Sequence, residues 1–225
     1  MNKKITIAID AMGGDSSPGK TIEGVKIFIE KNSKNNDFIL NLFGNEIEIK
    51  KILKEKKIQS NFIKITNTNS VVSDDDTPLT AIKSSKDTSM WKSIRSQIDG
   101  DSDISLSAGN TGVLLVISKM ILKMMKNINK PALAGLWPNK KGLSIVLDLG
   151  ANIECDSKNL IDFAELGSAL SKSLSPDETP KVALLNIGSE EIKGTDILKD
   201  AFKKLKDLSS ENNFIFNGYI EGNNL

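Results

Sequence analysis

Serine, glycine, asparagine and threonine cluster between Ser107 and Gly112, where a short β-rich run gives way to a long apolar helix. The backbone N–H groups of such a turn, with the N-terminus of the following helix, can hold an anion without a charged side chain. The plainer alternative is a strand–helix turn in which Asn110 or Thr111 only caps the helix. We predict an anion site at this turn, formed by Ser107, Gly109, Asn110, Thr111 and Gly112.

Turns of similar composition follow other β-rich runs, at residues 10–15, 43–45, 148–152 and 186–194. Ligands of an open parallel sheet bind at the carboxyl ends of its strands, where glycine lets the backbone turn tightly. We therefore expect these turns to meet around one polar, anion-accepting site. Besides the first turn, the candidate residues are Asp10, Gly13, Gly14, Asp15, Asp148, Gly150, Asn152, Asn186, Gly188, Glu190, Lys193 and Gly194.

The composition removes several kinds of chemistry. The chain has no histidine, which excludes nucleophiles activated by histidine and removes the commonest zinc ligand. Neither the G-x-G-x-x-G pattern of dinucleotide sites nor the P-loop signature occurs, and we expect no cofactor. The acids at 74–76 are expected to form a solvated turn rather than a metal site. With 30 basic and 29 acidic residues and only 5% aromatic residues, no nucleic-acid partner is expected.

Two single residues have competing interpretations. Cys155 could carry an acyl group, but this requires a lowered pKa, and the adjacent Glu154 and Asp156 would raise it. We therefore expect Cys155 to be a packed thiol. Lys193 could pair with a bound anion or with one of two neighbouring glutamates, and the sequence favours neither.

Short apolar runs alternate with longer helical patterns along the whole chain. Strands are predicted at residues 5–9, 38–43, 62–65, 104–106, 143–147, 182–185 and 214–216, and helices at 21–32, 46–56, 78–99, 112–126, 160–174 and 197–208. Such alternation is typical of βαβ units on a mostly parallel sheet. Thr77 and Pro78 are expected to start one helix. We predict a single α/β domain over residues 1–225.

Three further expectations concern the surroundings of the chain. The almost wholly apolar segment 113–125 is expected to be a core helix, with a subunit interface or a membrane-surface helix as alternatives. A single cysteine favours the reducing cytoplasm, and no apolar run is long enough for a signal peptide or a membrane span. A strand is expected at 214–220 with no crossover helix after it, so the fold is predicted to be incomplete at its carboxyl terminus.

Taken in order, the turns resemble the phosphate acyltransferase family of bacterial phospholipid synthesis, which converts acyl-[acyl carrier protein] and inorganic phosphate into acyl phosphate. The matching stretches are residues 7–15, 86–90, 107–112, 131–134, 147–152 with Cys155, 184–194 and 213–221. The resemblance implies a three-layer α/β/α sandwich with a doubly wound sheet, akin to phosphotransacetylases and isopropylmalate-type dehydrogenases. Family members continue beyond this length, and they tend to be basic at the position of Ser84.

The resemblance also implies roles for the candidate residues. Phosphate near neutral pH is already a nucleophile and needs positioning more than it needs a base. The turn 107–112 would hold phosphate through its amides and Asn110, Lys193 would neutralise charge, and Asn152 or Asn186 would donate to the thioester carbonyl oxygen. The aspartates named above would orient these donors.

The implied partners are acyl-[acyl carrier protein], inorganic phosphate, a second copy in a homodimer and a downstream glycerol-phosphate acyltransferase. At most peripheral contact with a membrane is expected. Two alternatives remain at this point. One is a phosphotransacetylase-like enzyme that uses coenzyme A, and the other is a truncated, non-catalytic relative that binds phosphate or a partner subunit.

Overall fold

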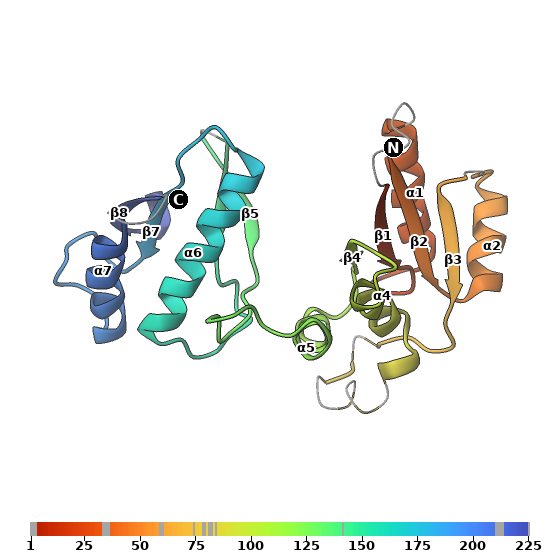
Figure 1. The fold of residues 1–225 in the computed structure, drawn as a ribbon, viewed down its shortest axis with the longest axis horizontal. Coiled ribbons are helices and arrows are strands. Elements are labelled where there is room, and N and C mark those ends of the chain that lie inside the picture. Colours follow the sequence, from red (N-terminus) through yellow and green to blue (C-terminus); the bar gives the residue numbers. More distant parts are fainter. Residues whose placement is uncertain are drawn as a thin grey trace. The chain divides into compact units, whose positions relative to one another are not determined.

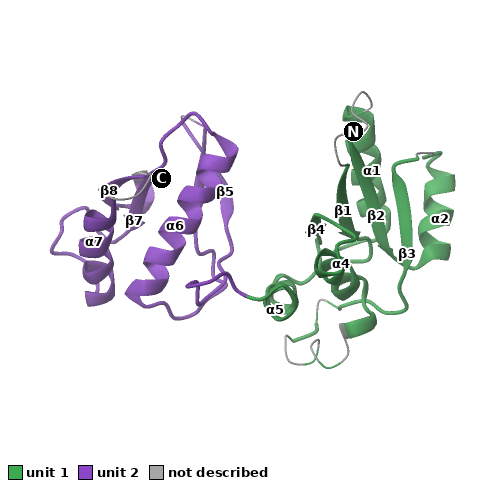
Figure 2. Cartoon of the chain, viewed as in Figure 1, with its two compact units in different colours: residues 1–123 green, residues 124–225 purple. Residues whose placement is uncertain are grey.

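The chain folds into two compact units, Met1–Lys123 and Met124–Leu225 (Figure 2). The computed structural model describes residues 4–32, 37–58, 61–73, 75–77, 80, 83, 85–140, 142–209 and 214–224. Each unit has its own core and is described by itself. The expectation of one domain over residues 1–225 stays a prediction.

The first unit is built on a parallel sheet of four strands with the order β3-β2-β1-β4 (Figure 1). The strands are β1 (Ile5–Asp10), β2 (Phe38–Gly44), β3 (Ile63–Asn67) and β4 (Ile104–Leu106). The helices are α1 (Gly19–Lys31), α2 (Glu46–Glu55), α4 (Ser89–Ile98) and α5 (Thr111–Leu122), with a 3-10 turn, η1, at Ser85–Asp87. This unit confirms the prediction of an α/β fold with a parallel sheet.

Helices cover the two faces of this sheet differently. On one face, α1 and α2 bury Ile22 and Ile49 against Leu40 and Leu42. Successive residues of a strand point to opposite faces, and Ser105 of β4 donates to the carbonyl of Ser93 in α4, so α4 lies on the other face. The result is three layers, α1 and α2, then the sheet, then α4.

The second unit contains two small sheets. Strand β5 (Gly135–Asn139) pairs antiparallel with β6 (Gly142–Val146), and β7 (Lys181–Leu185) pairs parallel with β8 (Ile215–Ile220). Helices α6 (Ser157–Leu174) and α7 (Asp196–Ser209) pack with β7 and β8, and a 3-10 turn, η2, spans Gly222–Asn224. The core of this unit consists of Ile161, Ala164, Leu184, Ala201, Leu205, Phe214 and Tyr219.

All seven predicted strands occur, and two details differ from the sequence-based expectations. Strand β5 was not predicted, because Pro138 interrupts its pattern, and it runs antiparallel to its partner. Within the helix predicted at 78–99, Thr80 and Lys83 are helical, the 3-10 turn η1 interrupts the helix at Ser85–Asp87, and α4 begins at Ser89, capped by Thr88. The hydroxyl of Thr77 accepts from the amide of Thr80 as a cap would. Pro78 and the departure at position 84 lie outside the described residues.

The apolar helix α5 is shorter than predicted and packs as a core helix on one side. It ends at Leu122 rather than near residue 126, because Lys123 has a φ of 67°, which is not helical. Val113, Ile117 and Ile121 are buried against α4. Among the described residues, no helix combines the length and apolar character required to cross a bilayer.

Candidate functional site

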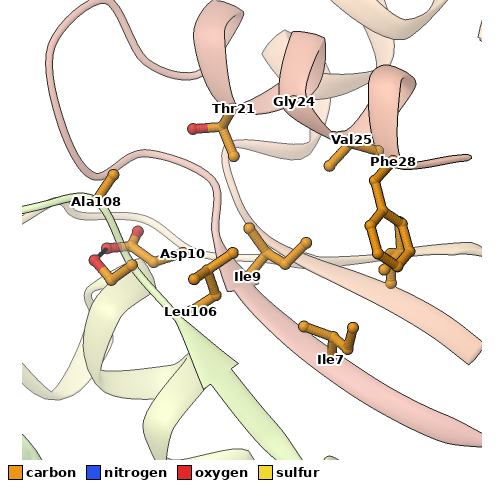
Figure 3. Close-up of a pocket in the computed structure, with 11 residues that line it drawn as sticks. Ile7, Ile9, Asp10, Thr21, Gly24, Val25, Phe28, Leu106 and Ala108 are labelled. Carbon is orange, nitrogen blue, oxygen red and sulfur yellow. Dashed lines mark hydrogen bonds between the residues drawn. The ribbon is translucent and has the colours of Figure 1, made fainter. Parts of the chain in front are cut away.

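The turns after β1 and β4 meet at a hydrogen-bonded acid (Figure 3). The Ser107 hydroxyl donates to Oδ2 of Asp10 at 2.7 Å and accepts from the Gly109 amide at 3.1 Å. The amide of Met12 donates to the other oxygen of Asp10 at 3.3 Å. Asp10 is only 2% exposed, so burial makes these partners necessary. The carboxylate therefore fixes both turns, which are 97 residues apart in sequence.

Two glycines allow this close approach. A Cβ atom on Gly13 would lie 2.5 Å from Oδ2 of Asp10 and 2.9 Å from Oγ of Ser107. A Cβ atom on Gly14, which has a φ of 87°, would lie 2.6 Å from the Ala108 carbonyl oxygen. Any side chain at either position would push the two turns apart. The geometry therefore requires glycine at both positions, while their contact with a ligand stays a prediction.

Asn110 begins helix α5 and is held on both sides of its amide group. Its Oδ1 accepts from the Val113 amide at 3.1 Å, which makes it the N-cap, and its Nδ2 donates to the Asp76 carbonyl at 3.1 Å. Thr111 and Gly112 form the exposed first turn of the helix. An anion placed here would face backbone amides at a helix N-terminus, where negative charge is favoured.

The contact with Asp76 was not predicted from the sequence. The Asp76 carboxylate accepts from the Ser73 amide at 2.8 Å and so closes the turn that presents the Asp76 carbonyl to Asn110. The acids at 74–76 were expected to form a solvated turn; Asp75 is an exposed turn residue, and Asp74 lies outside the described residues. No local pattern could link positions 34 residues apart. In the turn after β1, the second candidate acid, Asp15, is exposed.

In the second unit, Asp148 organises the turn after β6. It accepts from the amides of Leu133 and Asn152, each at 2.8 Å, and from the Asn152 side chain at 3.0 Å. The Asn152 Nδ2 also donates to the Pro131 carbonyl at 2.8 Å. Burial raises the pKa of Asp148, but these hydrogen bonds outweigh that effect and hold the pKa below its ordinary value. Gly150, with a φ of 82°, lets the backbone close around the acid.

The turn after β7 is closed by Asn186. Its Oδ1 accepts from the amide of Ile187 at 2.9 Å and its Nδ2 donates to the Lys193 carbonyl at 3.1 Å. Gly194 has a φ of 96°, and a Cβ atom there would lie 2.8 Å from Oδ1 of Asn186. Gly188 is less constrained, because a Cβ atom there would meet only the flexible side chains of Lys193 and Glu190. Asn186 therefore holds this turn in one compact shape.

The side chain of Lys193 pairs with Glu190 at 2.9 Å. This hydrogen bond raises the pKa of Lys193 and lowers the pKa of Glu190. Glu191, the other candidate partner, instead has its Oε1 3.7 Å from Nζ of Lys206. Of the two interpretations left open by the sequence, the structure shows the pair with glutamate, on an exposed turn where an anion could exchange for the carboxylate.

Cys155 is partly exposed and poorly suited to nucleophilic attack. Burial raises the pKa of its thiol, and Asp148 and Asp156 raise it further against the opposing effect of Lys130. This agrees with the interpretation of a packed thiol.

Within the part of the chain that the structure describes, no three histidine, cysteine, aspartate or glutamate side chains gather closely enough to hold a metal ion.

The structure thus groups the predicted residues into three clusters. The first contains Asp10, Gly13, Gly14, Ser107, Gly109, Asn110, Thr111 and Gly112. The second contains Asp148, Gly150 and Asn152, and the third contains Asn186, Gly188, Glu190, Lys193 and Gly194. The first lies in one unit and the other two in the second. Their convergence on one site stays a prediction.

Comparisons with known proteins give a consistent result. A family model described as "Fatty acid synthesis protein" matches residues 5–225. A phosphate acyltransferase from Pelagibacter ubique (strain HTCC1062) is 52% identical over 225 residues, which are 100% of this chain and 66% of the relative. One from Rhodospirillum rubrum is 38% identical and is covered to 63%. The chain therefore spans slightly less than two thirds of the length of these relatives.

Solved structures resemble the fold at low sequence identity. A phosphotransacetylase from Streptococcus pyogenes has a TM-score of 0.71 and 14% identity, with 98% of this chain and 69% of that chain covered. The EutD phosphotransacetylase from Staphylococcus aureus has a TM-score of 0.67 and 17% identity, with coverages of 97% and 69%. This likeness confirms the predicted fold class.

Proposed function

The chain belongs to the fatty acid synthesis protein family, and from that membership we propose that it transfers a fatty acyl group from acyl-[acyl carrier protein] to inorganic phosphate. The acyl phosphate formed would feed phospholipid synthesis. Relatives that align with the whole chain at 52% and 38% identity are named phosphate acyltransferase, which supports transfer to phosphate.

The reaction places particular demands on a site. A phosphate oxygen forms a bond to the thioester carbonyl carbon, and the C–S bond breaks through a tetrahedral oxyanion. The thiolate leaves and takes the proton that hydrogen phosphate gives up, so no external acid or base is consumed. The site must hold a dianion against the thioester and donate hydrogen bonds to the developing oxyanion.

The observation that carries the proposal is the junction of the β1 and β4 turns. The Asp10–Ser107 hydrogen bond and the glycines beside it hold the N-terminus of α5 open toward solvent. Backbone amides there offer donors to phosphate, and such a site needs no charged side chain. Asn110 positions this turn through its cap and its bond to the Asp76 carbonyl.

We propose that the two candidate asparagines of the second unit, Asn152 and Asn186, have different roles. The Nδ2 group of an asparagine has two hydrogens to donate. In Asn152 they are directed at Pro131 and Asp148, so its role is to hold the turn. The Nδ2 of Asn186 donates to one protein acceptor, the Lys193 carbonyl, whereas that of Asn152 donates to two. Asn186 is therefore the better candidate for donating to the thioester carbonyl oxygen.

The role of Lys193 can be tested by substitution. If its ammonium leaves Glu190 to neutralise a substrate anion, Lys193→Ala lowers the turnover with phosphate at least about tenfold, since tenfold is about 1.36 kcal/mol of barrier. The matched control is Lys204→Ala, which removes a similar exposed pair with Asp200 and should leave turnover unchanged. Equal activity of both variants and the parent would refute the role.

We also propose the finer features of this function. The carrier is acyl carrier protein, the working form is a homodimer, and a glycerol-phosphate acyltransferase consumes the product. The chain works in the cytoplasm, with at most peripheral contact with the membrane. The family description supports a place in fatty acid and lipid metabolism.

The deciding experiment is an assay of the purified chain with acyl-[acyl carrier protein] and phosphate. Phosphorus NMR should show acyl phosphate, with free carrier thiol released in equal amount and only when phosphate is present. If acyl phosphate forms from acyl coenzyme A and phosphate but not from acyl-[acyl carrier protein], the phosphotransacetylase-like alternative is selected. Phosphate binding with no product from either thioester would select the non-catalytic alternative.

A further inference from the structure

Ser17 lies between the turn after β1 and the start of α1, and it holds two carbonyl groups of that turn. Its hydroxyl donates to the carbonyl oxygen of Gly13, and its backbone amide donates to that of Gly14 at 3.3 Å. The hydroxyl has a single proton, which is used in this bond, so Thr21 is the donor of the 3.4 Å contact between the two hydroxyl oxygens. Both glycine carbonyls are therefore directed at Ser17.

The orientation of the two carbonyls fixes the amides that follow them. The peptide bonds after Gly13 and Gly14 are trans, and in a planar trans peptide the C=O and N–H bonds point in opposite directions. Because the two carbonyls face Ser17, the N–H groups of Gly14 and Asp15 point away from it. No described residue accepts a hydrogen bond from either N–H group.

This turn lies against the start of the candidate anion site. The Cα atom of Gly13 is 3.3 Å from where a Cβ of Gly109 would be, and a Cβ on Gly13 would lie 2.9 Å from the Gly109 nitrogen. The turn after β1 therefore borders the turn 107–112, where we expect an anion to bind.

The glycines that allow this approach leave the turn without a fixed orientation of their own. Glycine adopts positive and negative φ with similar ease, so the peptide between Gly13 and Gly14 can turn over. A carbonyl oxygen would then occupy the side that the N–H group of Gly14 faces. Because a carbonyl oxygen is only an acceptor, it would repel a phosphate oxygen instead of donating to it. A group outside the two glycines is needed to select one orientation.

We propose that Ser17 is a positioning residue for phosphate. Its hydroxyl holds the Gly13 carbonyl away from the anion, and this keeps the N–H group of Gly14 as a donor beside those at the start of α5. Ser17 itself does not touch the anion. The inference rests on the proposed function only in naming phosphate as the anion, and phosphate binding is measured without turnover.

The first test is a phosphate titration of the chain, followed by NMR of its backbone amides. In the parent chain, phosphate should shift the amide signals of Gly14 and Thr111 with one Kd, because both face one anion. Ser17→Ala removes the donor to Gly13 and should raise this Kd at least about tenfold, since a hydrogen bond to a charged group is lost. A Gly14 signal that phosphate leaves unchanged in the parent, or an unchanged Kd in Ser17→Ala, would overturn the proposal.

Two further variants separate positioning from general stability. Ser17→Thr keeps the hydroxyl and should bind phosphate as tightly as the parent. Ser168→Ala is the matched control, because the partly buried Ser168 hydroxyl also donates to a carbonyl four residues earlier, that of Ala164, at 2.7 Å. This control should lose similar stability and keep the parent Kd for phosphate. An equal loss of affinity in Ser168→Ala would show that destabilisation alone explains the effect, and the positioning role would be wrong.

Steady-state kinetics give an independent measurement. With acyl-[acyl carrier protein] as the substrate, Ser17→Ala should raise the KM for phosphate and leave kcat and the KM for the thioester unchanged, because the lost interaction is one of binding. A lower kcat with a normal KM for phosphate would contradict the assignment. A parent chain that forms no acyl phosphate, yet binds phosphate in a manner that depends on Ser17, would refute the proposed function and leave the positioning role intact.

Discussion

Asp10 is a buried acid that holds two distant turns through a hydroxyl and a backbone amide. Ser107 both donates to it and accepts from Gly109, so one hydroxyl connects the carboxylate to the second turn. The glycines opposite have no room for a side chain. The candidate site is therefore a set of short polar side chains that fix the positions of backbone amides. The direction of those amides determines where an anion can bind.

The Ser107 hydroxyl should contribute measurably to stability. Ser107→Ala leaves a buried oxygen of Asp10 without this donor, which typically costs about 1–3 kcal/mol. Urea unfolding of the first unit should show this loss. The control in the same unit is Asn32→Ala, which removes an exposed bond to the Phe28 carbonyl and should cost much less. Equal stability of the two variants would mean that the Ser107–Asp10 hydrogen bond does not hold the two turns together.

Asn110 should affect turnover more than its capping role explains. Asn110→Ala removes an N-cap, at about 1 kcal/mol, and also the bond to Asp76, so turnover with phosphate should fall at least about tenfold. Asn110→Asp keeps a cap oxygen but loses the amide donor and adds negative charge beside the anion. It should fold normally and be equally impaired.

Asn45 provides the matched control for this pair. It caps α2 by accepting from the Glu48 amide at 3.1 Å, the same bond that Asn110 makes to Val113. Asn45→Ala should therefore lower stability by a similar amount without changing turnover. If Asn110→Ala keeps normal kcat/KM for phosphate, Asn110 has no part in positioning the anion site.

Secondary elements were predictable where local pattern and burial agree. Strand β2 reads as an apolar run interrupted only by Asn41, and it is buried along almost its whole length. The start of α5 at Thr111 follows from a serine–glycine–asparagine turn, since asparagine is a strong N-cap. Strand β5 was missed because its proline is unfavourable in a strand, and its pairing with β6 depends on a partner rather than on its own sequence.

The partners of turn residues were not predictable in the same way. Leu133 and Pro131 hold Asp148 and Asn152 through their backbone groups. Every residue has such groups, so no residue type marks these positions. The Asp76 carbonyl that fixes Asn110 is a similar case. Sequence identifies the side chains of a polar turn, whereas the backbone groups they bind depend on tertiary packing.

The turn after β6 should make the stability of the second unit depend on acidic pH. Hydrogen bonds hold the pKa of Asp148 below its ordinary value of 3.8, which applies to the unfolded chain. The stabilisation is therefore complete above pH 3.8 and is lost as pH falls through the lower pKa of the folded state. Urea unfolding of the second unit at pH 7 and at pH 3 should show a smaller difference for Asp148→Asn than for the parent chain. An identical difference would exclude this contribution.

The whole molecule is a pair of compact units, each with its own core and its own polar turns. The order of strands and helices follows from the sequence because apolar runs and caps alternate along it. The division after Lys123 does not follow from it, since residues 124–134 carry no run of linker-like composition. The exposure of Ile104 and Leu106 on β4 was also unpredictable, because exposure depends on what packs against a strand.

The open N-terminus of α5 should make stability depend on phosphate. A ligand that binds the folded chain stabilises it by RT ln(1 + [L]/Kd), about 2.7 kcal/mol at a hundred times Kd. Inorganic phosphate should therefore raise the unfolding temperature of the first unit in calorimetry, beyond the effect of chloride at equal ionic strength. Asn110→Asp should remove this increase, because its carboxylate repels the anion, whereas Asn45→Ala should keep it. A shift of equal size in the Asn110→Asp variant would place the phosphate elsewhere and contradict the assignment of this turn.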